Sequence, residues 1–154
     1  MLNWYAVLKY IHVVSVVIWI GGLTGLVIAT WKIAREKNRA LLATLLNQTN
    51  AYAQGVAGPA AGFVLLTGLT MVWLGHIGFN TFWVWFGYGG VLVQAVVGGF
   101  VIRKRSMELL ALASTSSGDD AALAAASRRL RNAQVIYLIL FAIVIAGMVI
   151  KPTP

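Results

Sequence analysis

Residues 4–30 read WYAVLKYIHVVSVVIWIGGLTGLVIAT and form a long apolar run in which Lys9 is the only charged residue. A hydrocarbon core about 30 Å thick needs roughly 20 apolar residues of helix to cross it. Three further runs meet this requirement and contain no charged residue: 53–75, 81–102 and 133–150. Apolar residues occupy every face of the expected helices, which is typical of membrane spans rather than of helices lying on a membrane surface. The sequence therefore predicts an all-α, polytopic membrane protein built as a four-transmembrane-helix bundle.

The composition agrees with this fold class. Of the 154 residues, 60% are hydrophobic and only 10% are charged, and the mean hydropathy is +0.83. A soluble domain would carry about 25% charged residues. No internal repeat or linker divides the chain, so we expect residues 1–154 to form a single domain. The absence of cysteine excludes thiolate clusters and haem attached covalently through cysteine.

The basic side chains orient the expected bundle. The connection between the second and third runs carries no charge, whereas ten of the twelve basic residues lie in the other two connections: Lys32, Arg35, Lys37, Arg39, Arg103, Lys104, Arg105, Arg128, Arg129 and Arg131. The positive-inside rule places those two connections in the cytoplasm and both termini on the non-cytoplasmic side. Charges flanking membrane spans explain the net charge of +8 better than nucleic-acid binding does. We therefore expect the lipid bilayer, and no nucleic acid, as a partner.

The two basic connections contain helical patterns of their own. Residues 35–53, REKNRALLATLLNQTNAYA, place four leucines at helical spacing, and we expect this segment to continue the first helix or to lie along the cytoplasmic face. Residues 107–113 should extend the third helix. Asp119 and Asp120 should begin a new helix, where carboxylates suit the positive end of the helix dipole, and this helix should lead into the fourth span.

Two histidines are candidate ligands for a cofactor. His12 lies about two turns inside the first span and His76 lies at the end of the second, so both should lie near the non-cytoplasmic side. Neutral imidazoles are axial ligands of haem iron, and a bis-imidazole pair suits electron transfer. Lys9 and Lys151, on the same side, could pair with haem propionates, and Trp19 could line the cofactor pocket. The alternatives are a solvated His76, a Lys9 that anchors in the headgroups, and a Trp19 that packs in the core.

The run LKYIHVVSVVIWIGG at residues 8–22 resembles the first helix of a group of small bacterial four-helix membrane proteins. The group includes an uncharacterised family of predicted integral membrane proteins, the membrane domain of CopD-like copper-resistance proteins, and the HemJ family of protoporphyrinogen oxidases. The shared pattern is Lys-x-x-His followed by a Trp and paired small residues. Residues 62–73 are similar to the second helix of these proteins, and residues 149–152 to their end. The resemblance implies the bacterial cytoplasmic (inner) membrane.

In the haem-containing relatives the first-helix histidine ligates or neighbours b-type haem, and the resemblance implies this role for His12. Two departures weigh against porphyrinogen oxidation. Residues 82–87, FWVWFG, lack the lysine that HemJ-like enzymes carry near the start of a later helix, and residues 35–39 only loosely match the motif that follows their first helix. The four methionines form no cluster of copper ligands, so copper transport ranks lower still.

The sequence leads to one favoured function and two alternatives. The favoured function is binding of b-type haem near the outer membrane face through His12, for electron transfer. The first alternative is a cofactor-free accessory or structural subunit of a larger respiratory or photosynthetic membrane complex; a homo-oligomer is a further candidate assembly. The second, a transporter or an enzyme acting on a lipophilic molecule, is disfavoured because the spans contain no carboxylate. Whether the protein is an enzyme does not follow from the sequence.

Overall fold

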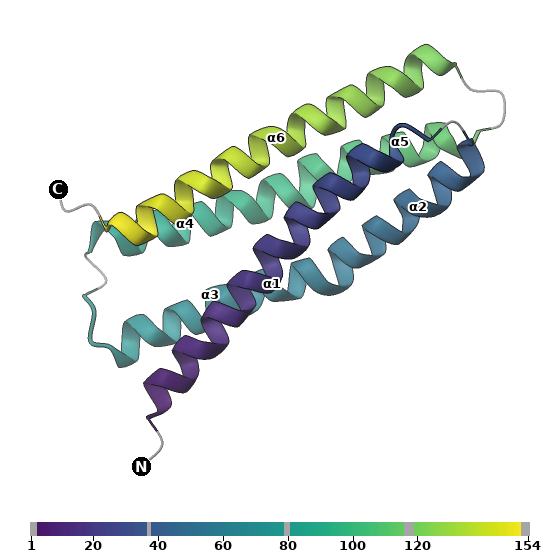
Figure 1. The fold of residues 1–154 in the computed structure, drawn as a ribbon. Helices are drawn as coiled ribbons and strands as arrows, with labels where there is room; N and C mark the ends of the chain where they lie inside the picture. The colour runs from purple at the N-terminus through teal and green to yellow at the C-terminus, as the bar shows by residue number, and fades with distance from the viewer. Residues whose placement is uncertain (1–2, 37, 79–80, 116–118, 152–154) are drawn as a thin grey trace.

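The computed structural model describes residues 3–36, 38–78, 81–115 and 119–151. Its helices in chain order are α1 (Trp4–Ile33), α2 (Arg39–Tyr52), the π-helical η1 (Ala53–Ala57), α3 (Gly58–Leu74), α4 (Phe82–Val96), the π-helical η2 (Val97–Ile102), α5 (Arg103–Ala113) and α6 (Asp120–Ile150). The described residues contain no strand. The predicted all-α class is thereby confirmed (Figure 1).

The eight elements join into four long helices. The π-helical segment η1 connects α2 to α3 without a break, and η2 does the same between α4 and α5, so that residues 39–74 and 82–113 are each continuous. All four long helices are apolar and long enough to cross a membrane, which confirms the predicted four-transmembrane-helix bundle. A helix of 32 residues is about 48 Å long, which exceeds a hydrocarbon core of about 30 Å. One end of the bundle must therefore project beyond the core.

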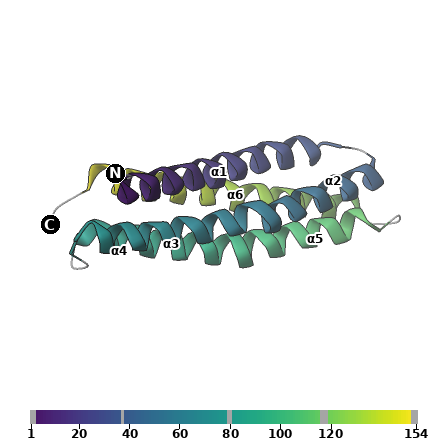
Figure 2. The same ribbon diagram turned by 90° about the horizontal axis from the view of Figure 1, so that it is seen from below.

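Neighbouring helices run antiparallel, so the bundle has two distinct ends (Figures 1 and 2). The helix α1 begins and α6 ends at one of them, called here the terminal end. The connections from α1 to α2 and from α5 to α6 lie at the opposite end, called here the basic end because the cationic connections gather there. Of the basic residues named above, Lys37 lies outside the described residues.

The prediction for residues 35–53 was wrong. Helix α1 ends at Ile33, the chain reverses, and Asn38 starts the second long helix by accepting a hydrogen bond from the Leu41 N–H at 3.2 Å. The leucine stripe of this segment packs against α5 and α6 instead of against a membrane face. The extension of the third helix over residues 107–113 is confirmed as part of α5. Asp119 caps α6 by accepting the Ala121 N–H at 2.8 Å, as the sequence predicts.

The interior contains two separate groups of buried residues. The aromatic core lies in the membrane-spanning part and comprises Trp19, Ala57, Ala60, Val64, Tyr137 and Phe141. The leucine core lies toward the basic end and comprises Leu42, Leu46, Leu109, Ala113, Ala126 and Leu130. In the aromatic core, the Trp19 and Phe141 rings meet edge to face with centroids 4.7 Å apart. This contact joins α1 to α6 across the bundle.

Glycine allows α4 and α6 to approach closely near the terminal end. A Cβ added at Gly90 would lie 2.5 Å from Val144 Cγ2, which is too close for any real contact. Gly87 and Gly147 are similarly placed against Met148 and Phe86. Within lipid the hydrophobic effect does not drive helices together, so van der Waals contacts at small residues supply the attraction instead.

Candidate functional site

His12 lies at the contact between α1 and α3, where its side chain is half-buried. Its Nδ1 is 2.9 Å from the hydroxyl oxygen of Thr67 on α3. The next residue of α3, Gly68, faces the ring edge: a Cβ there would lie 3.3 Å from His12 Cε1. A small residue at this position therefore leaves room for the imidazole between the two helices.

The hydrogen bonds around Thr67 assign the tautomer of His12. A threonine hydroxyl has one proton to donate, and the Thr67 oxygen lies 2.5 Å from the Phe63 carbonyl of its own helix. With that proton donated to Phe63, the oxygen accepts the Nδ1–H of His12. The Val64 carbonyl, 3.3 Å from the same hydroxyl, is a second acceptor beside the ring. The remaining ring nitrogen, Nε2, therefore carries the lone pair that a metal ligand needs.

His76 lies in the turn that follows α3 and is exposed. Its φ of 50° is in the left-handed region, one of two such non-glycine residues among those described. The chain from Thr67 to His76 covers nine residues, which corresponds to roughly 13 Å along the direction of α3. The structure therefore places the exposed His76 at the end of α3, beyond the level of His12, and the pairing of the two imidazoles as axial ligands stays a prediction.

The other predicted site residues lie in three different places. Lys9 is exposed one turn nearer the terminal end than His12. Lys151 ends α6 in the left-handed conformation, and its Nζ lies 4.9 Å from the centre of the Trp83 ring, within the range of a cation–π contact. Trp19 is buried in the aromatic core and lines a cavity that does not include His12.

That cavity was not predicted from the sequence. It has a volume of about 390 Å³, opens to the surface, and is lined by residues of all four long helices. Both π-helical segments contribute to its wall, η1 through Gln54 and Ala57 and η2 through Gly98 and Gly99. Departures from α-helical winding often occur at functional sites because they change which side chains face the interior. Gln94 lies mid-span in the sequence, and its polarity there was the one signal that pointed to this region.

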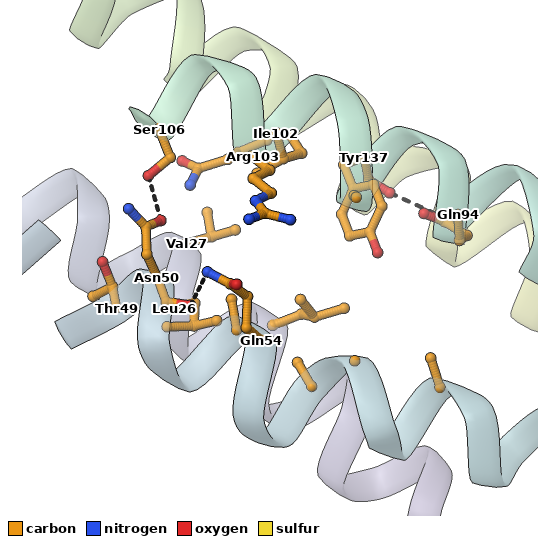
Figure 3. A pocket seen from close by; sticks show the side chains of 18 of the residues that line it. Leu26, Val27, Thr49, Asn50, Gln54, Gln94, Ile102, Arg103, Ser106 and Tyr137 are labelled. Carbon is orange, nitrogen blue, oxygen red and sulfur yellow. Dashed lines mark hydrogen bonds between the residues drawn. The ribbon is translucent and has the colours of Figure 1, made fainter. Parts of the chain in front are cut away.

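Polar side chains gather at the part of the cavity nearer the basic end (Figure 3). Ser106 donates a hydrogen bond to Asn50 Oδ1 at 2.6 Å, which ties α5 to α2. The Gln54 amide donates to the Asn50 carbonyl at 3.3 Å. The guanidinium of Arg103 extends from the start of α5 into the space facing Gln54 (Figure 3). This part of the cavity thus combines hydrogen-bonding groups with a positive charge.

Two buried glutamines line the deeper part. Gln94 is only 1% exposed and donates its amide to the Tyr137 carbonyl at 3.5 Å, so this mid-span polar side chain has a partner inside the bundle. The Oε1 atoms of Gln94 and Gln134 have no hydrogen-bond partner among the described residues. A buried acceptor without a donor is costly, and a water or a ligand that donates a proton would satisfy it.

Among the described residues, no three His, Cys, Asp or Glu side chains cluster as a metal site. A single imidazole such as His12 falls outside that pattern, so this result bears on metal ions held by several side chains and not on haem.

Comparison with known proteins agrees with the architecture. The model of a family described as "Predicted integral membrane protein (DUF2269)" matches residues 6–152. No curated protein and no solved structure matches the chain. The resemblance to an uncharacterised family of integral membrane proteins is therefore confirmed, while the grouping with CopD-like and HemJ-like proteins stays a prediction. Because the match extends over nearly all of its length, the chain belongs to the DUF2269 family of integral membrane proteins.

Proposed function

We propose that this protein binds b-type haem through His12 Nε2 and takes part in electron transfer within the membrane. The observation that supports the proposal is the hydrogen bond from His12 Nδ1 to Thr67. Metal-binding histidines almost always donate the other ring N–H to an acceptor, which sets the tautomer and the orientation of the ring. Thr67 is such an acceptor, and Gly68 leaves space beside the ring.

The fit of haem to these residues is partial. Of the two histidines, His12 is half-buried between α1 and α3, whereas His76 is exposed in the turn after α3, so we assign one axial nitrogen to His12. Haem bound to His12 would supply a one-electron carrier. Lys9, exposed one turn nearer the terminal end, is the cation best placed along α1 to pair with a propionate. Lys151 lies over the Trp83 ring, and its pairing with a propionate stays a prediction.

The proposed orientation follows from charge. The positive-inside rule places the basic end in the cytoplasm, so that the terminal end, and His12 with it, would face the non-cytoplasmic side of a bacterial inner membrane. Electron transfer would then take place near the outer membrane face. Reporter fusions at the two termini, with reporters active on only one side of the membrane, test this orientation directly.

The test of haem binding is the visible absorption spectrum of the purified full-length protein, oxidised and reduced, from cells supplied with a haem precursor. We expect a Soret band in the wild type that is lost in His12→Ala. Thr67→Val keeps the side-chain shape but removes the acceptor, and it should weaken haem binding by about 10- to 100-fold, the usual cost of losing a partner of a metal ligand. His76→Ala is the matched control and should keep the spectrum.

A colourless wild type would contradict the proposal. It would favour the alternative function, a cofactor-free accessory subunit of a larger membrane complex, and co-purification with such a complex would then be the measurement to make. Loss of the Soret band in His76→Ala as well as in His12→Ala would show that both histidines are needed to hold the haem.

A further inference from the structure

The cavity extends from the edge of the hydrocarbon core to its middle. Helix α4 begins at Phe82, and Arg103 follows 21 residues later in the same continuous helix. At about 1.5 Å per residue the two are roughly 32 Å apart, close to the thickness of the core, so Arg103 lies at headgroup depth when Phe82 lies at the opposite interface. Gln94, 12 residues from Phe82, lies near the middle of the membrane.

Among the described residues that line the cavity, Arg103 alone is charged. Within the described part of the chain it forms no ion pair. Arg39 pairs with Asp120, and both Arg105 and Arg129 pair with Glu108, whereas Arg35, Arg128 and Arg131 resemble Arg103 in having no ion pair among the described residues. A guanidinium presents a planar fork of N–H donors that matches a carboxylate or a phosphate, so an anion is the ligand suited to this part of the cavity.

The opposite part of the cavity suits an apolar group. Trp19, Leu23, Ala57 and Ala61 line it, and the small alanine side chains leave its volume open. A volume of about 390 Å³ lies within the range of small-molecule sites, which are mostly apolar with a few convergent polar groups.

We propose that this cavity binds an amphipathic anion, whose single phosphate or carboxylate head contacts Arg103 and whose apolar body extends toward Trp19. The head lies at headgroup depth and the body within the hydrocarbon core, which is how an amphiphile is already oriented in a bilayer. The site is separate from His12, which does not line the cavity. The proposal therefore stands whether or not the protein binds haem.

The experiment is calorimetric titration of the full-length protein in a neutral detergent with dodecyl phosphate. We expect saturable binding of one dodecyl phosphate per chain and an affinity that falls at least tenfold in Arg103→Gln. Arg103→Lys keeps the charge without the planar fork and should give an intermediate affinity. Lys104→Gln removes the same charge from the next residue, which does not line the cavity, and should stay within twofold of the wild type.

A second variant tests the apolar part. Ala61→Leu fills the cavity without changing its charge and should also weaken binding at least tenfold. Circular dichroism and thermal melting of every variant establish that it is folded. The proposal is overturned if Arg103→Gln and Lys104→Gln weaken binding equally, because equal effects would mean that any nearby positive charge attracts the anion. It is also overturned if a folded Ala61→Leu variant binds dodecyl phosphate as tightly as the wild type does.

Competition identifies the source of the anion. Inorganic phosphate at millimolar concentration should not displace dodecyl phosphate, because it lacks the apolar body, and full displacement would overturn the proposal. The same titration is made in nanodiscs of dioleoyl phosphatidylglycerol and in nanodiscs of dioleoyl phosphatidylcholine. Weaker binding of dodecyl phosphate in the phosphatidylglycerol nanodiscs would show that the bilayer lipid competes for the site and is the ligand. Equal binding in both nanodiscs would assign the site to a free amphiphile. The Soret band of the same samples reports separately on His12.

Discussion

The leucine core and the aromatic core are buried by different means. In the leucine core, Leu42, Leu46, Leu109 and Leu130 are at most 1% exposed, and ion pairs such as Arg39–Asp120 lie on the surface around them. This is the arrangement of a water-soluble helical bundle. Around the aromatic core, large apolar side chains such as Phe63, Leu66 and Ile139 point outward, and polar groups such as Gln94 and Thr67 point inward.

The difference follows from the solvent around each region. Water drives leucine side chains together, because burying each one is worth about 1.5–3 kcal/mol. Lipid offers no such gain, so the membrane-spanning part depends on close contacts at glycine and on interior hydrogen bonds. The membrane part can therefore accommodate a cavity and an intramembrane histidine, while the basic end contributes stability. Three experiments test whether the two regions are stabilised in these different ways.

The largest effect is expected in the leucine core. Leu46 is 0% exposed, and Leu46→Ala should lower the free energy of unfolding by about 2–5 kcal/mol through lost burial and the remaining cavity. Reversible unfolding in mixed micelles, followed by circular dichroism, measures the change. Leu41→Ala on the same helix removes an exposed side chain and is the matched control. Equal effects of the two variants would show that the leucine core does not hold the basic end together.

A smaller effect is expected at the contact of α4 with α6. Gly90→Ala places a Cβ against Val144, which cannot easily move aside because a helix restricts the rotamer of a β-branched residue. The substitution should lower the free energy of unfolding by about 1–3 kcal/mol. Gly89→Ala, one residue away, meets no atom within 4 Å and should be neutral or stabilising by about 0.5–1 kcal/mol, since alanine favours a helix. If Gly90→Ala lowers the free energy of unfolding and Gly89→Ala raises it in the same assay, the close packing of α4 on α6 at Gly90 contributes to stability. A stabilising Gly90→Ala would contradict it.

The smallest effect concerns the surface of the basic end. Glu108 lies 3.3 Å from Arg129 and 3.7 Å from Arg105, and all three side chains are partly exposed. Glu108→Gln should lower the free energy of unfolding by at most about 1 kcal/mol. If this end lies in water, the cost should disappear in 1 M salt, where screening acts over about 3 Å. A cost that 1 M salt leaves unchanged would mean that these pairs are shielded from water.

Local patterns were sufficient for some features and misleading for others. The spans were predictable because length and apolarity are properties of a continuous segment. The placement of residues 35–53 was not, because a leucine stripe identifies a helix with a buried face but not its partner, which lies on α5 and α6. The pairing of His12 with His76 rests on similar depth and stays a prediction, because depth leaves the distance between two side chains undetermined.

The sequence by itself determined the helical class, the four spans and the asymmetric distribution of charge, because each depends on residues that are neighbours in the chain. The packing of the helices brings Thr67 within hydrogen-bond distance of His12 Nδ1 and Arg103 to a cavity beside Trp19, and neither contact follows from the sequence. Those features join residues 55 and 84 positions apart, and such contacts arise from the way long helices pack side by side. The physical reason is that hydropathy places a helix in the membrane but does not set its rotation or its neighbours.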